Sequence, residues 1–345
     1  MAGVAVAGTL VADIIKKINY YPEKGALADI LDVSYGVGGC AANTAVGLKR
    51  LDPTIQVKSI GLTGNDANGA FLKEKLEEYG IDVSMIQTTE EALTAFSDVM
   101  TVESTGERTF FHTRGASRLF DESCLCLDKL DAELVLLGYG GLLDALNAPD
   151  ETYGIALTRA FHDLKERNIE TALDVATLKD QKEMQRLVVP ALRYVDYVII
   201  NEIEGGMIAG IEPRDAEGRL LPEKVEAICR KIMTLGVQKC CIIHAPELGC
   251  AVDLDGNCWM EPSLKLPKGY IVGAVGAGDA FCAGILYSIY RRLPIREALK
   301  IGAASAAANL SASDSVSGLR SIEETRKLYQ AYAAAETVSE TSGSK

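Results

Sequence analysis

Residues 273–284 of the chain read GAVGAGDAFCAG, a glycine-rich stretch that carries one acid, Asp279. Gly276, Ala277 and Gly278 precede an apolar helical pattern, so their amides would be unpaired at the start of a helix. Such donors, together with the positive end of the helix dipole, suit a phosphate or charge developing on one. Asp279 would then position a hydroxyl for attack on that phosphate, although Asp is also common at helix N-termini for structural reasons.

A second glycine cluster lies near the N-terminus, in GVGGCAANTA at residues 36–45. Gly38 and Gly39 would let the backbone approach a ligand closely, because neither carries a Cβ atom. Asn43 offers a hydrogen-bond donor and an acceptor, which suits a substrate rich in hydroxyl groups. The alternative is structural, a glycine turn followed by a helix that Asn43 caps.

The same cluster also allows an interpretation as a dinucleotide site. Gly36, Gly38 and Ala41 match the G-x-G-x-x-A fingerprint of NAD-dependent enzymes. That fingerprint belongs in the turn of the first strand–helix unit, with an acid at the end of the next strand. Here the first strand is expected at 4–11, well before the glycines, and the strand expected at 57–64 ends in no acid. An NAD-dependent enzyme is therefore the weaker alternative.

The elements that must position both clusters alternate between strand and helix patterns. The segments 158–175 and 194–206 each combine one helix and one strand. This succession predicts an α/β fold of three layers, α/β/α, with a mainly parallel central sheet covered by helices on both faces. Simple strand patterns lie at 4–11, 57–64, 133–139 and 239–245, and helical patterns at 41–51, 69–81 and around 222–235.

One region departs from this succession. Residues 94–115 form two alternating runs around the turn STGE, which predicts an antiparallel hairpin. Together with 13–35, which lacks a helical pattern, the hairpin predicts a small β lid made of 13–35 and 93–118. The α/β body, which carries both glycine clusters, would comprise 1–12, 36–92 and 119–330, followed by a disordered tail at 331–345.

Composition argues against several classes of protein. The chain has 35 Lys and Arg against 48 Asp and Glu, a net charge of −13, which disfavours a nucleic-acid-binding surface. No apolar run is long enough to span a membrane, and the N-terminus lacks the basic region of a signal peptide. The nine cysteines follow neither zinc-site nor disulfide spacing, which favours reduced thiols in a cytoplasmic protein. The expected ligands are therefore small molecules.

Together, the two clusters resemble the paired signatures of the ribokinase-like (PfkB) carbohydrate kinases. The resemblance extends over about residues 3–325. It implies a kinase that transfers the γ-phosphate of ATP to a hydroxyl of a sugar or sugar acid beneath the β lid. The similar motifs are Gly8-Thr9-x-x-x-Asp13, Gly38-Gly39-x-x-x-Asn43, Gly61-x-x-Gly64-x-Asp66-x-x-Gly69, Asn201-x-x-Glu204 and Gly276-Ala277-Gly278-Asp279.

The resemblance also implies a role for individual residues. Asp279 would be the catalytic base, and the amides of Gly276, Ala277 and Gly278 would form the anion hole. Glu204 would act on Mg²⁺ indirectly, through water or phosphate. The residues expected to bind substrate are Asp13, Gly38, Gly39, Asn43 and His112, and those expected to bind ATP are Asn201, Glu204, Gly249 and Ser305.

The sequence departs from the family pattern at three places. Gly273-Ala274 replaces the usual Asp-Thr, which puts the monovalent-cation site often found there in doubt. Pro246 stands where a glycine is expected before the retained Gly249, at the nucleotide side. Val11 replaces a polar residue that binds the sugar in ribokinases themselves, so ribose is a poor first guess for the acceptor.

The acceptor therefore stays open among a hexose or ketose, a sugar acid and a nucleoside. The lid run from Arg108 to Arg114, which includes His112, offers cations to an anionic or polar sugar, although an ordinary exposed hairpin face explains it equally well. Few aromatic residues flank the substrate motifs, which disfavours a nucleobase. A nucleoside kinase of the same family and a non-catalytic sugar-binding regulator remain the alternatives. The resemblance further implies a homodimer formed through the lid.

Overall fold

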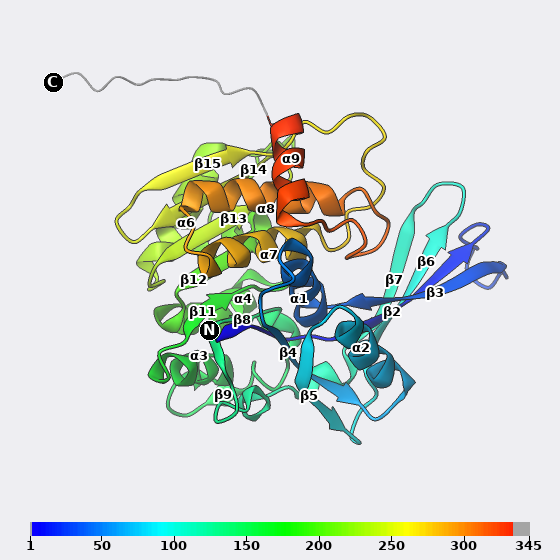
Figure 1. Cartoon of the computed structure of the whole chain (residues 1–345), viewed down its shortest axis with the longest axis horizontal. Coiled ribbons are helices and arrows are strands. Elements are labelled where there is room, and N and C mark those ends of the chain that lie inside the picture. The colour runs from blue at the N-terminus through cyan, green and yellow to red at the C-terminus, as the bar shows by residue number, and fades with distance from the viewer. Residues whose placement is uncertain (1, 334–345) are drawn as a thin grey trace.

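The computed structural model of the chain describes residues 2–333. Most of the tail predicted at 331–345 lies outside the described residues. The body is built on one nine-stranded sheet in the order β15-β14-β13-β12-β11-β8-β1-β4-β5 (Figure 1). Its strands are β1 (Gly3–Ala7), β4 (Val57–Gly64), β5 (Asp82–Thr89), β8 (Ala132–Leu137), β11 (Glu170–Leu173), β12 (Tyr197–Asn201), β13 (Cys240–His244), β14 (Leu248–Asp253) and β15 (Cys258–Pro262).

The central sheet is parallel from β13 through to β5, and only β14 and β15 join it antiparallel. Helices cover both of its faces, as the succession of patterns predicts. One face holds α1 (Cys40–Leu51), α2 (Ala67–Glu78), α7 (Ala277–Tyr290) and α8 (Ile295–Asn309), with α9 (Ile322–Tyr332) packed on α8. The other face holds α3 (Ala156–Glu166), α4 (Gln181–Val188), α5 (Glu202–Ala209) and α6 (Pro222–Thr234).

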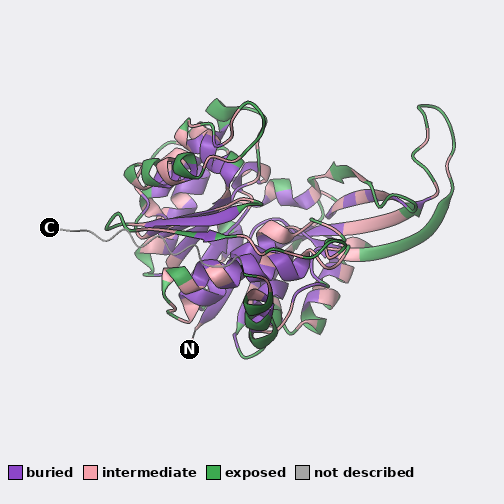
Figure 2. Ribbon diagram, turned by 90° about the horizontal axis from the view of Figure 1, so that it is seen from above, coloured by how far each residue is buried: buried purple, intermediate pink, exposed green. Residues whose placement is uncertain are grey.

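Strand β1 shows why two apolar cores form. Successive side chains of a strand point to opposite faces, so Val4 and Val6 enter one core while Ala5 and Ala7 enter the other. All four side chains are fully buried, and the sheet appears as the buried centre of the body in Figure 2. The remaining short elements are β9 (Pro149–Asp150), β10 (Gly154–Ile155), η1 (Gly115–Leu119), η2 (Glu122–Leu125), η3 (Gly140–Leu142) and η4 (Val189–Tyr194).

A second sheet of four strands forms a lid that projects from the body (Figures 1 and 2). Its order is β3-β2-β6-β7, and the hairpin predicted at 94–115 is its antiparallel pair β6–β7. Asp66 ties this pair to the body, because it caps α2 and also accepts a 2.7 Å hydrogen bond from the Thr94 amide just before β6. The lid strands are β2 (Val11–Ile18), β3 (Ile30–Gly38), β6 (Ala95–Val102) and β7 (Arg108–Thr113).

The prediction of one continuous strand at 4–11 is wrong. β1 ends at Ala7 and β2 begins at Val11, so the run is divided between the central sheet and the lid. Gly8 makes the crossing possible, since its φ of 145° is rarely adopted by other residues and a Cβ there would lie 2.6 Å from the Gly138 carbonyl oxygen. The apolar run conceals this change of sheet, because both segments are buried.

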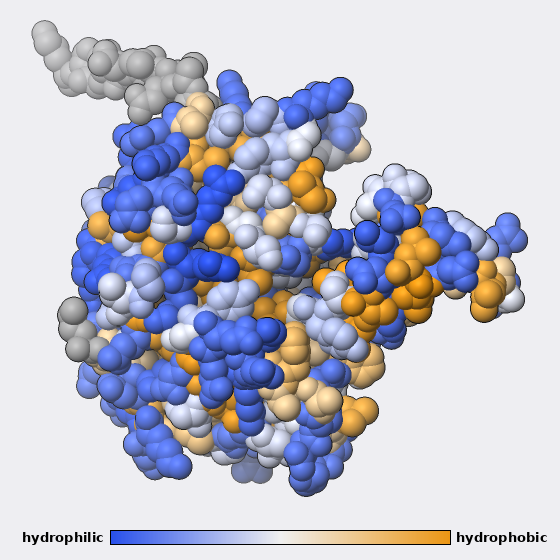
Figure 3. All heavy atoms as spheres, turned by 45° about the vertical axis from the view of Figure 1, so that its right-hand side comes forward, coloured by the Kyte–Doolittle hydropathy of each residue, from blue (hydrophilic) through white to orange (hydrophobic). Residues whose placement is uncertain are grey.

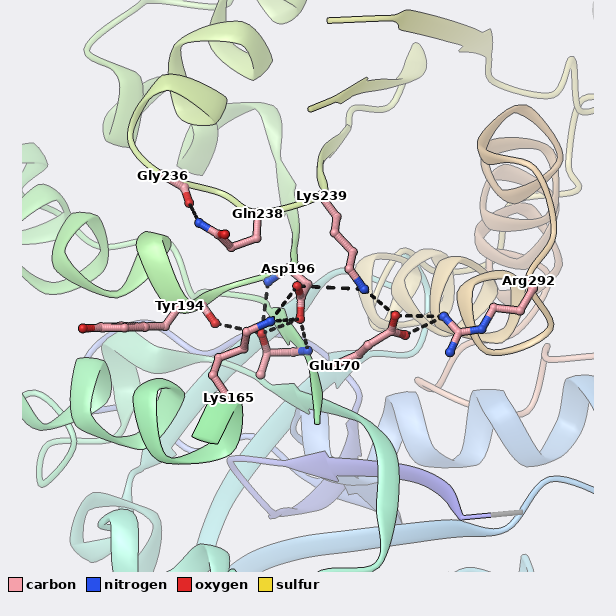
Figure 4. Close-up of polar contacts among 9 residues, drawn as sticks. Lys165, Glu170, Tyr194, Asp196, Gly236, Gln238, Lys239 and Arg292 are labelled. Carbon is pink, nitrogen blue, oxygen red and sulfur yellow. Dashed lines mark hydrogen bonds and ion pairs between the residues drawn. The ribbon is translucent and has the colours of Figure 1, made fainter. Parts of the chain in front are cut away.

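Ion pairs join the amino ends of the central strands (Figure 4). The Asp196 carboxylate is 1% exposed and accepts hydrogen bonds from Lys165 at 2.9 Å and from the Thr171 amide at 2.9 Å. Glu170 pairs with Lys239 and Arg292. These contacts hold the end of the sheet opposite to the carboxyl ends, where ligands bind in open α/β sheets.

Two further observations complete the fold. Within residues 2–333, no helix combines the length and the apolar character needed to cross a membrane. All nine cysteines are unpaired, and seven of them are buried.

Candidate active site

A cavity of about 290 Å³ opens between the lid and the carboxyl ends of the central strands. Strand β1 leads to it through Thr9, and β8 leads to it through Tyr139. The cavity brings together seven of the residues predicted from the two glycine clusters and the lid. They are Asp13, Gly38, Gly39, Asn43, His112, Gly276 and Asp279.

Asp279 lies in the first turn of α7 and is only 3% exposed. Gly276 caps this helix with a φ of 77°, and a Cβ on it would lie 2.7 Å from the Ser315 carbonyl oxygen, so glycine is required there. Asn309 of α8 donates a 2.8 Å hydrogen bond to the Val275 carbonyl and anchors the loop before the helix. The start of α7 is thus held against the cavity.

The amides of the predicted anion hole differ in availability. Ala277 donates a long, 3.3 Å hydrogen bond to the Ala274 carbonyl. The amides of Gly276 and Gly278 have no hydrogen-bond acceptor among residues 2–333. Two of the three amides are therefore free to meet an anion, and the third is weakly engaged; their role as an anion hole stays a prediction.

The Asp279 carboxylate is held by two donors from distant parts of the chain. Asn43 Nδ2 donates to Oδ2 at 2.9 Å, and the Tyr139 hydroxyl lies 3.0 Å from Oδ1 and 3.2 Å from Oδ2. Burial raises the pKa of Asp279, and the hydrogen bonds from Asn43 and Tyr139 partly counteract that rise. A raised pKa brings a carboxylate closer to the range in which it works as a general base.

Asn43 does not cap its helix, so the structural alternative for this residue is wrong. Gly39 occupies the N-cap of α1, and the Asn43 side chain reaches Asp279 instead. Its Oδ1 atom is buried and has no hydrogen-bond partner among the described residues. A substrate hydroxyl that donates to Oδ1 would satisfy this atom.

The first glycine cluster shapes the opposite wall of the cavity. A Cβ on Gly38 would lie 2.6 Å from Asp13 Oδ2, and a Cβ on Gly39, whose φ is 82°, would lie 2.4 Å from the Thr9 carbonyl oxygen. Gly36 and Gly38 belong to the lid strand β3, not to a turn after β1, so the cluster lacks the context of a dinucleotide fingerprint. These glycines instead bring Asp13 and the start of α1 together.

Asp13 itself lies on lid strand β2. Burial raises its pKa to about 6, while a hydrogen bond with Ser97 and the charge of Arg108 act in the opposite direction. Ser97 also lies 3.1 Å from Nδ1 of His112, which links the predicted lid residue to the same wall. Burial and the charge of Arg114 lower the pKa of His112, which favours the neutral form of its ring.

Asn201 and Glu204 lie outside the cavity, where β12 passes into α5. They form a reciprocal capping box: Asn201 Oδ1 accepts from the Glu204 amide at 2.8 Å, and Glu204 Oε2 accepts from the Asn201 amide at 3.1 Å. Burial raises the pKa of Glu204 to about 7. Asp174 interacts electrostatically with Glu204 and with Asp279 of the cavity. Burial raises the pKa of Asp174, and the charges of Glu204 and Asp279 raise it further.

Gly249 and Ser305 are buried in the packing between sheet and helices. A Cβ on Gly249 would lie 3.3 to 3.4 Å from Leu299 and Phe281, and Ser305 is 2% exposed next to Gly284. Neither residue lines the cavity. The roles of Asn201, Glu204, Gly249 and Ser305 in ATP binding stay predictions.

Sequence reasoning gave no role to several polar residues of the cavity, although Thr9 belongs to one of the quoted motifs. Thr9, Ser97, Ser117 and Tyr139 all line it, and the Ser117 Oγ atom is buried without a hydrogen-bond partner among the described residues. One signal would have found Tyr139: it is the last residue of the apolar strand pattern at 133–139, and carboxyl ends of parallel strands meet at the ligand site. Ser97 and Ser117 give no comparable signal in the sequence.

The model of the pfkB family carbohydrate kinases matches residues 1–321. Ribokinase of Haemophilus influenzae is 24% identical over 326 residues, covering 93% of this chain and 96% of that protein. The 2-dehydro-3-deoxygluconokinase of Dickeya dadantii is 27% identical over 273 residues, covering 76% and 82%.

Among solved structures, that of Arabidopsis thaliana ribokinase complexed with ribose and ATP superposes with a TM-score of 0.77. It covers 96% of this chain and 99% of that one at 20% identity, a level at which the likeness concerns the fold. The predicted α/β/α fold with its mainly parallel sheet and β lid is confirmed.

Proposed function

Because this chain belongs to the pfkB family of carbohydrate kinases, and is thus a phosphotransferase with an alcohol group as acceptor, we propose that it phosphorylates a sugar or sugar acid with ATP. One observation carries the proposal. The Asp279 carboxylate, at the start of α7, shares a single cavity with Asp13 and Asn43, which offer hydrogen-bonding groups for hydroxyls. The same helix start presents free amides for a phosphate.

The chemistry follows from this arrangement. An acceptor hydroxyl lies against Asp279, which receives its proton while the oxygen forms a bond to the γ-phosphorus and the bond to ADP breaks. The amides of Gly276 and Gly278 stabilise negative charge on the transferred group. Holding hydroxyl and phosphate together accounts for roughly 7–11 kcal/mol of the barrier, so positioning matters more than base strength.

Asp13 and Asn43 orient the acceptor. The Asp13 carboxylate and the unpartnered Asn43 Oδ1 accept hydrogen bonds from sugar hydroxyls, and Ser117 Oγ is available on the lid side. Arg114 lines the cavity but already pairs with Asp144. A neutral sugar leaves this pair intact, whereas a sugar acid would have to compete with Asp144 for the guanidinium.

Magnesium would enter with the nucleotide. In the part of the chain that the structure describes, no three acidic, histidine or cysteine side chains converge on a common metal position. Both Glu204 oxygens already accept hydrogen bonds, from the Asn201 amide and the Thr177 hydroxyl. This fits a Mg²⁺ held mainly by phosphates and water, near Glu204 and Asp174, where it would neutralise charge on the phosphates.

The proposal is tested by ADP release from Mg-ATP across a panel of hexoses, ketoses, sugar acids and nucleosides, with the product identified by ³¹P NMR. One sugar or sugar acid that is turned over far faster than the rest is the expected result. Running the panel in K⁺ and in Na⁺ tests the effect of Gly273-Ala274, which offer no side-chain ligand for a monovalent cation. If no acceptor stimulates ADP release but sugars still bind, the result would favour a non-catalytic sugar-binding regulator.

The lid supports pairing with a second copy of the chain as part of this proposal. Figure 3 shows apolar side chains gathered on the projecting lid. Pairing of two lids would remove this surface from water. Large exposed apolar patches are rare on monomeric proteins and commonly mark interaction sites. Light scattering after size-exclusion chromatography should give the mass of a dimer. The mass of a monomer at micromolar concentration would refute pairing through the lid. The large exposed side chains include Ile30, Leu31, Val33, Tyr35, Phe110 and Phe111.

We also place the protein in the cytoplasm, where ATP is abundant and thiols stay reduced. The nine unpaired cysteines fit such a compartment.

A further inference from the structure

Tyr139 combines a rare backbone conformation with contact to the reacting carboxylate. It lies two residues after the last residue of β8, Leu137, and adopts φ 59° and ψ 40°, a left-handed conformation that bulky residues seldom adopt. Hydrogen bonds on either side keep it there: the Gly138 amide donates to the Ala7 carbonyl at 2.9 Å, and the Leu142 amide donates to the Tyr139 carbonyl at 2.8 Å. Strain of this kind persists where surrounding structure enforces it, and it is often found at functional sites.

The result of this conformation is the placement of one hydroxyl. The Tyr139 oxygen lies 3.0 Å from Oδ1 and 3.2 Å from Oδ2 of Asp279, so its hydroxyl donates a bifurcated hydrogen bond to both oxygens. Oδ2 also accepts from Asn43 at 2.9 Å. Oδ1 therefore carries fewer hydrogen bonds than Oδ2 and keeps a lone pair for an incoming proton.

We propose that Tyr139 is a positioning residue for phosphoryl transfer: its hydroxyl fixes the Asp279 carboxylate so that a remaining lone pair of Oδ1 accepts the proton of the acceptor hydroxyl. The inference rests on the proposed function and adds to it a residue outside all five motifs of the family resemblance. Asn43 alone would leave the carboxylate with a single donor, and the carboxylate could then rotate about its Cβ–Cγ bond.

The surroundings of Asp279 make this donor important. The ionisable groups that face it come from four elements: Asp13 from the lid, Cys40 from α1, Asp174 after β11 and Cys282 from α7 itself. Each of these groups either carries negative charge or would gain it on ionisation, so none stabilises an ionised Asp279. The hydrogen bonds from Asn43 and Tyr139 are the interactions that lower the Asp279 pKa against burial.

The kinetic test compares the wild-type protein with Tyr139→Phe, using the best acceptor of the panel. Tyr153→Phe is the matched control, because it also removes one hydroxyl, which there lies 3.2 Å from His162 outside the cavity. We expect kcat to fall roughly tenfold in Tyr139→Phe while KM for ATP stays within about twofold. The acidic limb of the kcat/KM profile should move to higher pH, because Asp279 loses a donor that favours its ionised form. A merely structural role would not move this limb.

Two results would overturn the inference. One is a kcat and an acidic limb that match those of the control. The other is a higher kcat with a lower KM for the acceptor, which would mean that the hydroxyl competes with the acceptor for Asp279.

A titration independent of turnover separates this inference from the proposed function. Asp side chains of the full-length protein are labelled with ¹³C at Cγ, and the Asp279 signal is assigned by its loss in Asp279→Asn. Its midpoint should lie at higher pH in Tyr139→Phe than in wild type, and coincident midpoints would refute the role of Tyr139. If the wild type phosphorylates no acceptor, the proposed function fails. The titration still decides whether the Tyr139 hydroxyl donates to the Asp279 carboxylate.

A second variant covers the case in which Tyr139→Phe does not fold. Incorporation of 3-fluorotyrosine at position 139 keeps the ring and makes its hydroxyl a stronger donor. The Asp279 midpoint should then move to lower pH, opposite to the shift in Tyr139→Phe. A midpoint that does not move would contradict the proposed hydrogen bond.

Discussion

Replacing Asp13 by Asn should stabilise the unliganded protein while it weakens acceptor binding. Burial raises the Asp13 pKa from 3.8 to about 6, so at pH 8 the folded protein holds a carboxylate that is costlier to ionise than in the unfolded chain. A shift of about 2 pH units corresponds to about 3 kcal/mol of unfolding free energy. Asparagine has no charge to desolvate, so up to about 3 kcal/mol is recovered, less any loss in the hydrogen bond with Ser97.

The pH dependence gives this prediction its sign. Between pH 3.8 and about 6, the folded protein keeps a proton on Asp13 that the unfolded chain has lost. The destabilisation by Asp13 is therefore absent below pH 3.8, grows through this window and is complete above about pH 6. The advantage of Asp13→Asn should accordingly be about half as large at pH 5 as at pH 8.

Calorimetry at both pH values measures the effect. For 345 residues the unfolding entropy is about 0.7 kcal/mol/K, so about 3 kcal/mol raises Tm by about 4 °C at pH 8. Asp255→Asn, an exposed acid between β14 and β15, is the control and should leave Tm nearly unchanged. KM for the acceptor should rise at least about tenfold in Asp13→Asn, because charge-assisted hydrogen bonds to the sugar are lost. No Tm gain at pH 8, or an equal gain at both pH values, would refute the reasoning.

Two further substitutions probe the site and the opposite end of the sheet. Gly38→Ala places a Cβ 2.6 Å from Asp13 Oδ2 and should raise KM for the acceptor about tenfold without affecting KM for ATP. Gly36→Ala is the control, because its Cβ meets only ordinary contacts beyond 3.6 Å and should be neutral. Equal steady-state kinetics for both variants would contradict the assignment of Gly38 and Asp13 to the acceptor-binding wall of the cavity. Lys165→Met leaves the Asp196 carboxylate, which is 1% exposed, without its closest cation. The free energy of unfolding, measured in urea, should fall by about 1–3 kcal/mol, a range that allows for solvent screening of Lys165 at 33% exposure. An unchanged urea midpoint would show that the ion pair is dispensable.

Much of the fold follows from local patterns that the sequence displays. The α1 helix was expected at 41–51 and is found at Cys40–Leu51, and the β6–β7 hairpin lies within the predicted 94–115. These elements have strong periodicity, which local sequence determines. The division of residues 4–11 between two sheets was not predictable in this way, because the crossing depends on the approach of Gly8 to Gly138, far away in the chain.

The site shows the same division between local and long-range information. Motifs and spacing pointed to Asp279, Asn43 and Asp13, and the structure places all three in one cavity. The hydrogen bond between Asn43 and Asp279 joins residues 236 positions apart, so sequence alone left a helix cap as an alternative explanation for Asn43. The strand pattern at 133–139 indicates that Tyr139 lies near the site, but its contact with Asp279 depends on a left-handed backbone that no residue pattern predicts.

The most direct test of the central claim is the rate of phosphoryl transfer in Asp279→Asn, measured in a single turnover with Mg-ATP and the acceptor selected by the panel. The account predicts a rate lower by about 10²–10⁴-fold with ATP binding retained, because asparagine cannot receive the proton of the acceptor hydroxyl. A rate close to that of the wild type would contradict the assignment of Asp279 as the catalytic base and, with it, the mechanism proposed for this cavity.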